Sequence, residues 1–302
     1  MEAVRKNGLV IDGLLGEHLV DTLETFTDLS DIEIDSGVTA VFISVKSSDT
    51  AEAVQKLAES GLVGDTTLVI SLQNGLGNLE QIRETFGPQR SFGGRVIFGA
   101  QVTQPGHVHV SVWADKVLIG APKADLSQAD PLRSHPGQGS GQAGLSAAGD
   151  LAQLLTLSGI ETEIDDNIEA ALWGKVLYNV GLNPLSALLK VSYGELGRQG
   201  NARALLIALI KEAFSVASRE VQLAWGSADE YLDLFFSQLL PSTDSHFSSM
   251  LQDIEQGRET EIEAITGQVI RRAELLNLPV PVNRVVYDLV KAKVATASGR
   301  NR

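Results

Sequence analysis

The chain has 302 residues, 43% of them hydrophobic, and a formal net charge of −14 at pH 7. This acidity argues against binding to nucleic-acid phosphates and to anionic membrane surfaces, and the absence of cysteine excludes disulfides, thiolate zinc sites and cysteine nucleophiles. No apolar run approaches the roughly 18 residues of a membrane span, and residues 1–20 lack the apolar core of a signal peptide. We therefore expect a cytoplasmic protein of about two domains.

Strands alternate with helices in the first half of the chain. Thr39–Val45 and Thr67–Leu72 are nearly continuous apolar runs rich in β-branched residues, which is typical of parallel strands buried on both faces. Helical spacing follows each run, over 51–60 and 79–86, and this order favours an open α/β sheet. Three alternating stretches between 96 and 120 predict antiparallel strands that complete or extend the sheet.

The second half of the chain is expected to be helical. Residues 121–146, rich in Pro, Gly, Ser and Gln, predict a flexible surface loop, as an insertion or a lid. From about Asp166 the periodicity predicts six helices, at 167–189, 201–220, 227–239, 246–256, 260–276 and 282–294. We expect an α/β domain over 1–165 and an all-α domain over 166–302.

A polar stripe on an apolar helix is the clearest chemical signal. Ala171–Leu189 is apolar nearly all round, and its strongly polar side chains are Lys175, Asn179 and Asn183. The i, i+4, i+8 spacing places them on one face, and buried polar groups need partners. A solvated face is the alternative, but such a face usually carries more charges, so the pattern favours a polar cleft.

Other polar residues of this half have structural explanations. Thr260 with Glu263 fits a capping box for the helix that follows, and Glu261 would lie in the first turn, where the helix dipole favours a carboxylate. Ser249 with Gln252 would cap the preceding helix in the same way. By themselves these residues do not indicate catalysis.

Lys46 and Asn74 are distinguished by their position. Each lies at or just beyond the carboxyl end of a predicted strand, the edge at which open α/β sheets bind ligands. Asn74-Gly75 is also a common turn pair, so a turn alone would explain it.

Few other motifs point to a reaction. His107 and His109 share a face of one predicted strand, but no further ligand stands at zinc spacing, and we expect no metal site. The chain has no G-x-S-x-G elbow, no Walker A motif and no G-x-G-x-x-G between a strand and a helix.

Several motifs in the same order resemble the ketopantoate reductase (2-dehydropantoate 2-reductase) family, over about Asn7 to Lys293. They are VKSSDT, LQNGLGNLE, WGKVLYNVGLNPLSAL, SSMLQDIEQGRETEIEAITG and LPVPVN. The resemblance implies a Rossmann-like dinucleotide-binding domain, a helical C-terminal domain, and NADPH-dependent reduction of 2-dehydropantoate to pantoate in pantothenate and coenzyme A synthesis.

The resemblance also implies roles for individual residues. Lys175 would donate the proton to the substrate carbonyl, with Glu261 orienting it, and Asn179, Asn183 and Ser249 would hold the substrate hydroxyl and carboxylate. The chemistry agrees, because hydride addition to a ketone develops negative charge on oxygen, which a nearby ammonium stabilises and protonates.

The cofactor end is implied in the same way. Asn74 would lie near both nicotinamide and substrate, while Lys46 and Glu261 would contact the cofactor. The expected ligands are NADPH and a small 2-oxo acid, with no nucleic acid or membrane partner and a homodimer left open.

Two departures from the family pattern keep alternatives open. Tyr193 stands where the pattern usually has Asn, which puts one substrate contact in doubt and leaves a paralogous 2-oxo-acid reductase as an alternative. The family's opening strand, G-x-G-x-x-G turn, helix and second strand would precede Met1, so we expect an incomplete Rossmann-like domain with an exposed sheet edge. A downstream start codon or a truncated product would explain this, and a non-catalytic remnant that binds a small acid or a protein is the further alternative.

Overall fold

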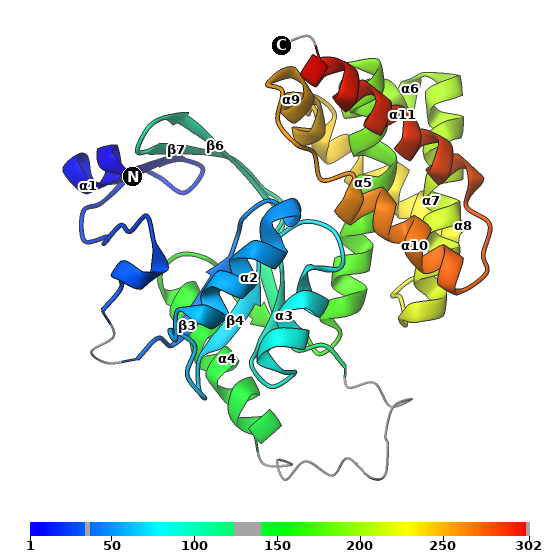
Figure 1. The fold of residues 1–302 in the computed structure, drawn as a ribbon. Helices are drawn as coiled ribbons and strands as arrows, with labels where there is room; N and C mark the ends of the chain where they lie inside the picture. Colours follow the sequence, from blue (N-terminus) through cyan, green and yellow to red (C-terminus); the bar gives the residue numbers. More distant parts are fainter. Residues whose placement is uncertain (34–36, 124–139, 300–302) are drawn as a thin grey trace, which may run out of the picture. The chain divides into compact units, whose positions relative to one another are not determined.

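A computed structural model describes residues 1–33, 37–123 and 140–299, which form two compact units (Figure 1). The first unit comprises Met1–Ser44, Ala51–Leu72 and Leu79–Ile168. The second comprises Val45–Thr50, Gln73–Asn78 and the chain from Glu169 onward. Two short segments from the first half of the sequence therefore belong to the helical unit.

The first unit contains a five-stranded, mostly parallel sheet. Its order is β3 (Ala40–Ile43), β4 (Leu68–Ser71), β5 (Ser91–Arg95), β8 (Val117–Gly120) and β9 (Thr162–Ile164). Strands β3, β4 and β5 run parallel, β8 is antiparallel to β5, and β9 is parallel to β8.

Helices cover both faces of this sheet. They are α2 (Thr50–Glu59), α3 (Asn78–Phe86) and α4 (Ser140–Leu157). Val69 of β4 is buried in one cluster with residues of α2 and α3, whereas its neighbours Leu68 and Ile70 are buried in another with Ala148 and Leu151 of α4. This alternation follows from the period of two in a strand, so β4 is covered on both faces, as its apolar run predicted.

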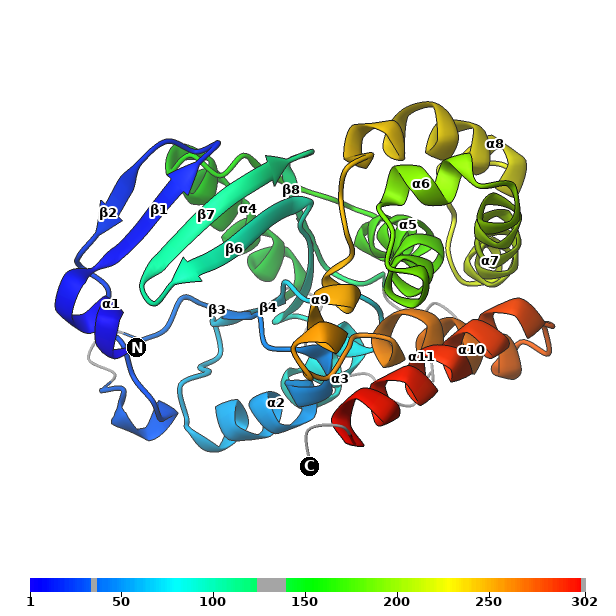
Figure 2. The ribbon, with the colours of Figure 1, turned by 90° about the horizontal axis from the view of Figure 1, so that it is seen from above.

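A second, four-stranded sheet lies in the same unit. Its order is β2 (His18–Val20), β1 (Leu9–Gly13), β7 (His107–Trp113) and β6 (Phe98–Gln104), and α1 (Glu2–Asn7) precedes β1 (Figure 2). The prediction that all three stretches between 96 and 120 extend the main sheet is therefore wrong for two of them. Only β8 joins that sheet, because alternation shows that a strand has one covered face but does not specify its partner.

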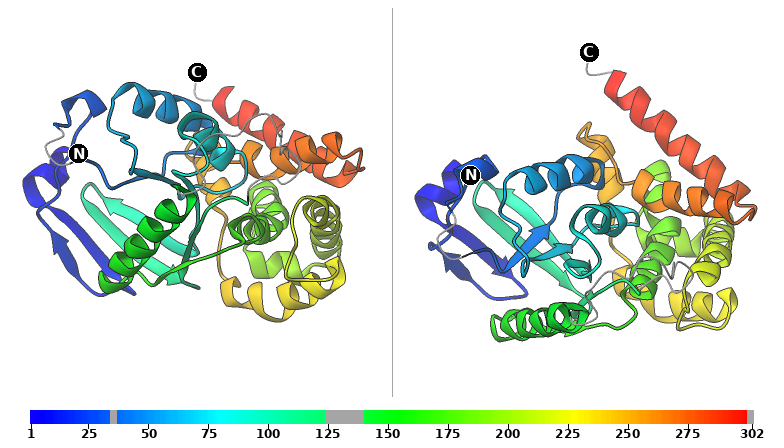
Figure 3. Two further views of the ribbon diagram at one scale, coloured as in Figure 1. Left: turned by 90° about the horizontal axis from the view of Figure 1, so that it is seen from below. Right: turned by 60° about the horizontal axis from the view of Figure 1, so that its bottom comes forward.

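The second unit is helical throughout its described chain from α5 onward. Its helices are α5 (Ile168–Leu189), α6 (Tyr193–Arg198), α7 (Gly200–Glu220), α8 (Ala228–Leu234), α9 (Ser249–Glu255), α10 (Gln268–Leu275) and α11 (Pro281–Gly299). Phe235–Leu239 and Glu263–Gly267 are π-helical turns. The long α11 ends the described chain (Figure 3).

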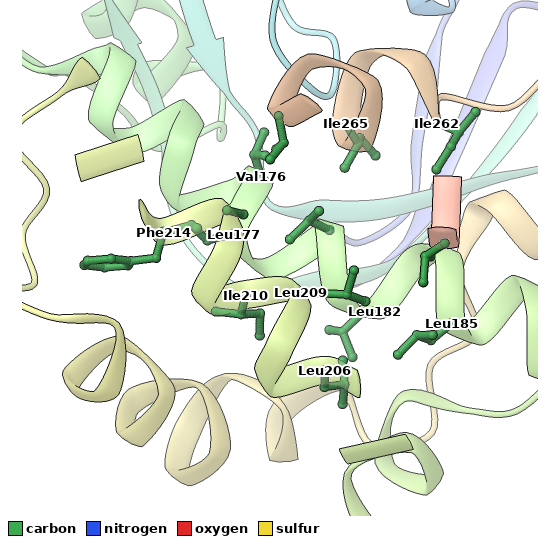
Figure 4. Close-up of a cluster of buried hydrophobic side chains, with 14 of the residues drawn as sticks. Val176, Leu177, Leu182, Leu185, Leu206, Leu209, Ile210, Phe214, Ile262 and Ile265 are labelled. Atoms are coloured by element: carbon green, nitrogen blue, oxygen red, sulfur yellow. The ribbon is translucent and has the colours of Figure 1, made fainter. Parts of the chain in front are cut away.

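The core of this unit forms around α5 and α7. Figure 4 shows apolar side chains of both helices in one buried cluster, which also includes Ile262 and Ile265. Gly181 of α5 permits the close approach, because a β-carbon there would lie 2.9 Å from Leu206 Cδ2. Glu212 of α7 accepts hydrogen bonds from the backbone N–H groups of Val282 and Asn283 and so caps α11.

The predicted fold class, a Rossmann-like unit followed by a helical one, is confirmed. Part of the predicted 121–146 loop, at 124–139, lies outside the described residues. The rest of that prediction is wrong from Ser140 onward, where α4 begins. Gly and Ser argued against a helix, but an apolar stripe that packs on the sheet outweighs their low propensity.

Candidate active site

The polar stripe of α5 is formed as the spacing predicted. Lys175, Asn179 and Asn183 lie one turn apart on a single helix, within the second unit. Asn179 is 8% exposed and Asn183 5% exposed, and Lys175 is half-buried. The helix is therefore not a solvated amphipathic surface but presents amides and an ammonium in largely buried positions.

Asn183 is held at two points. Tyr193 Oη donates a hydrogen bond to Asn183 Oδ1 at 2.8 Å, and Ser248 Oγ donates to the Asn183 carbonyl oxygen at 3.2 Å. Burial raises the pKa of the Tyr193 hydroxyl well above its usual value, and the nearby Tyr178 adds to this. The hydroxyl is thus protonated at neutral pH and acts as a donor.

Lys46 meets a buried carboxylate. Its Nζ lies 2.6 Å from Asp253 Oδ2, and Arg258 Nε donates to Asp253 Oδ1 at 2.9 Å. Asp253 is 2% exposed, whereas the Lys46 side chain is 39% exposed. One buried anion therefore orients two partly exposed cations, and Lys46 retains N–H groups that a ligand can use.

Asn74 meets Glu261. Asn74 Nδ2 donates to Glu261 Oε2 at 2.9 Å, and the backbone N–H of Leu76 donates to the carbonyl oxygen of Ala264, in the second π-helical turn, at 2.8 Å. Gly75 has φ +84° and no room for a β-carbon, which would collide with the Ala264 carbonyl. The Gln73–Asn78 turn is thus attached to the start of the α10 region by close backbone contact.

The prediction that Ser249 caps α9 is wrong. Ser248, not Ser249, is the N-cap of α9 and accepts from the Leu251 N–H, and Ser249 is exposed at the first helical position. The structure brings Ser248, not Ser249, to Asn183. The one-residue shift arises because either serine satisfies the cap pattern, whereas only the buried one also reaches α5.

The Thr260–Glu263 capping box is not formed, because the helix begins with a π turn at Glu263. The Glu263 carboxylate instead binds the Tyr287 hydroxyl and pairs with Lys291 and Arg271. Burial opposes ionisation of Glu263, but these partners outweigh it and leave its pKa below the ordinary value. The group serves the packing of α11 on the π turn.

The histidines of β7 have a partner that sequence reasoning missed. Asp12 of the adjacent β1 binds His109 Nδ1 at 2.6 Å and His107 Nε2 at 2.8 Å. Strand pairing between β1 and β7 was needed to find it, because the residues are 95 and 97 positions apart. Within the described ranges, no group of three or more His, Asp or Glu side chains is arranged to hold a metal ion.

Comparison with known proteins identifies the family. The sequence model described as "Ketopantoate reductase PanE/ApbA" matches residues 1–123, and "Ketopantoate reductase PanE/ApbA C terminal" matches residues 167–294. The chain belongs to this family. The resemblance seen in the motifs is thereby confirmed.

Relatives and solved structures agree with this assignment. The chain is 34% identical to 2-dehydropantoate 2-reductase of Aquifex aeolicus over 95% of its own length and 86% of the relative's. It is 31% identical to the Pyrococcus horikoshii enzyme of the same name, over 99% and 88%. The crystal structure of a PanE/ApbA family ketopantoate reductase from Ralstonia eutropha JMP134 has a TM-score of 0.79 at 26% identity, covering 98% of this chain and 88% of that one.

A D-mandelate dehydrogenase solved with NADH and anilino(oxo)acetate shares the fold, with a TM-score of 0.78 at 23% identity over 98% of this chain and 88% of that one. Family membership, with relatives named 2-dehydropantoate 2-reductase, supports an oxidoreductase that acts on CH–OH groups. None of the helices described is both long and apolar enough to cross a membrane.

Proposed function

We propose that the chain reduces 2-dehydropantoate to pantoate with NADPH, a step of pantothenate and coenzyme A synthesis. The observation that carries this proposal is the stripe of Lys175, Asn179 and Asn183 in largely buried positions of α5. A half-buried ammonium with neighbouring buried amides suits a small, negatively charged carbonyl compound. The relatives named 2-dehydropantoate 2-reductase supply the particular substrate.

Each residue has a defined task in this proposal. Lys175 donates its proton to the carbonyl oxygen as negative charge develops there. Asn179, Asn183 and Ser249 bind the substrate hydroxyl and carboxylate. Glu261 orients Lys175, since a nearby carboxylate favours the protonated amine.

The residues present fit the nicotinamide end of a dinucleotide. Lys46 is partly exposed and held by Asp253, so it can bind a phosphate or ribose oxygen without becoming an unpaired charge. Asn74 and Glu261 are hydrogen-bonded to each other and provide an amide and a carboxylate for the ribose and carboxamide groups. Bound NADPH supplies the hydride that adds to the ketone carbon. We assign residues 1–165 to the cofactor domain and 166–302 to the catalytic domain, with the difference that the segments Val45–Thr50 and Gln73–Asn78, which carry Lys46 and Asn74, belong to the second unit.

The test is a fluorescence titration with NADPH, followed by turnover with 2-dehydropantoate. Lys175→Ala is expected to lower kcat by about 100-fold or more, because a positioned general acid contributes about 10²–10⁴ in rate. Lys211→Ala removes an exposed lysine of α7 that pairs with Asp229 and is the matched control. An active Lys175→Ala enzyme, or wild-type protein that binds NADPH without reducing any 2-oxo acid, would refute the proposal.

A paralogous 2-oxo-acid reductase is the second candidate. It is favoured by Tyr193, whose hydroxyl occupies the amide oxygen of Asn183 and so changes what that side chain offers a substrate. Relative kcat/KM for 2-dehydropantoate and for 2-oxo acids without its hydroxyl group separates the two candidates. A preference of less than about threefold for 2-dehydropantoate would favour the paralogue, since one good hydrogen bond is worth more than that.

A further inference from the structure

The carboxamide of Asn183 has only one side left for a ligand. An asparagine offers an acceptor oxygen and two N–H donors, and Oδ1 already accepts from Tyr193 at 2.8 Å. Within the described residues, Asn183 Nδ2 donates to no protein acceptor. What Asn183 can offer to a bound molecule is therefore an N–H donor.

Tyr193 is built to keep this arrangement. It begins α6, whose first turn is fixed by a reciprocal capping box between Ser192 and Glu195. Its backbone N–H donates to the carbonyl oxygen of His246 at 2.9 Å. Its ring packs edge-on against Tyr178, with centroids 6.2 Å apart, and at a tilt against His246 at 5.9 Å. The phenol thus has little freedom to turn away from Asn183.

The direction of the hydrogen bond follows from the chemistry of the pair. Tyr193 is 5% exposed, and its hydroxyl proton needs an acceptor in this buried position. If the amide were flipped, Nδ2 would face the hydroxyl, and the phenolic proton would lose its acceptor. A buried donor without a partner is costly, so Tyr193 selects one orientation of Asn183.

We propose that Tyr193 is a positioning residue that sets the polarity of the substrate site, by locking Asn183 so that it recognises a hydrogen-bond acceptor. The acceptor is a carboxylate or carbonyl oxygen of the 2-oxo acid rather than a hydroxyl that donates. This inference rests on the proposed function for its substrate class, whereas the Tyr193–Asn183 lock itself does not. The presence of Tyr193, where the family pattern usually has Asn, therefore has a specific consequence for substrate recognition.

Two variants test the positioning role in the active enzyme. Tyr193→Phe keeps the ring but removes the donor, and it is expected to raise KM for the 2-oxo acid about tenfold with kcat changed less than about twofold. Tyr178→Phe removes a neighbouring hydroxyl that instead bonds Thr243 Oγ1 at 2.6 Å, and it is expected to leave KM unchanged. Equal KM in wild type and Tyr193→Phe would overturn the positioning role.

Asn183→Asp tests the polarity. The aspartate has nearly the same shape, can still accept from Tyr193, and cannot donate to the ligand. We expect a loss of binding of about 100-fold for the 2-oxo acid and its 2-hydroxy acid product, measured by calorimetry. Retention of binding within about threefold would show that the ligand donates at this position, and that result would overturn the inference.

A stability cycle separates this inference from the proposed function. Tyr193→Phe is expected to lower Tm by about 2–4 °C, but to have little further effect when Asn183 is already Ala. Coupled Tm shifts in protein that reduces no 2-oxo acid would refute the proposed function and leave the lock intact. Additive shifts would refute the lock, whatever the activity.

Discussion

The contact between the Gln73–Asn78 turn and the second π-helical turn makes a sharp prediction for Gly75→Ala. At φ +84° a residue with a β-carbon costs about 1–2 kcal/mol. The added carbon would also collide with the Ala264 carbonyl, so the turn must move and the 2.8 Å hydrogen bond from Leu76 must break. An orphaned buried polar group costs about 1–3 kcal/mol more. We therefore expect the free energy of unfolding to fall by about 2–5 kcal/mol.

Gly87→Ala is the matched control for this variant. Gly87 has φ +81°, and no heavy atom lies within 4 Å of the position of its added β-carbon. It therefore reports the backbone cost alone, about 1–2 kcal/mol. Urea unfolding of both variants measures the difference, and steady-state KM should rise only for Gly75→Ala, because Asn74 moves with the turn. If the two variants lose equal stability within about 0.5 kcal/mol, the argument from close contact is wrong.

Three carboxylates give further predictions. Hydrogen bonds from His109 and, second, from His107 hold the pKa of Asp12 below its ordinary 3.8. The stabilisation from Asp12 is present above that value and is lost as the pH falls through the lowered pKa. The loss of unfolding free energy in Asp12→Asn, followed in acid titrations, should therefore shrink below about pH 4. A constant deficit down to pH 2 would refute this. Asp253→Asn should cost only about 1–2 kcal/mol in urea unfolding, because both its cations are partly exposed, yet it should weaken NADPH binding in a fluorescence titration. Glu212→Ala removes the cap of α11 and should cost about 1–2 kcal/mol in the same unfolding assay, whereas Glu212→Gln should restore part of it.

The sequence predicts those helices and strands whose hydrophobic pattern is strong within one short segment of the chain. The α5 helix is long and apolar enough that Lys175 and the two asparagines stand out, and β4 is covered on both faces as its apolar run predicts. The same prediction is wrong for β3, which lies at one end of the sheet and leaves Phe42 38% exposed, because an apolar run does not show a strand's place in the sheet. The short α6 was missed although Ser192 and Glu195 form a capping box, because its six residues give too little periodicity. The π turns were also missed, because tertiary contacts rather than propensity determine where they form.

The sequence pattern does not predict side-chain contacts between residues that are far apart in the chain. The separation between Lys46 and Asp253 is 207 residues, and that between Asn74 and Glu261 is 187. Taken singly, Asn74 was explained by a turn and Glu261 by the helix dipole, so neither indicated the other. Only the fold places two short segments that follow β3 and β4 against the stretch from α9 to α10.

These two pairs determine how variants of the site must be interpreted. Removing Lys46 takes away a cofactor contact in the proposed function, but it also leaves the buried Asp253 with Arg258 as its only remaining ion-pair partner among the described residues. A loss of NADPH affinity in Lys46→Ala is therefore ambiguous, because part of it reflects movement of the whole Val45–Thr50 segment. Lys46→Arg resolves the ambiguity: it keeps a cation beside the buried Asp253, which Tm reports, and presents N–H groups of different geometry to the ligand, which the affinity reports. If Lys46→Arg keeps Tm and loses affinity, Lys46 binds the cofactor directly; if it keeps both while Lys46→Ala loses both, the ion pair with Asp253 is what the site requires.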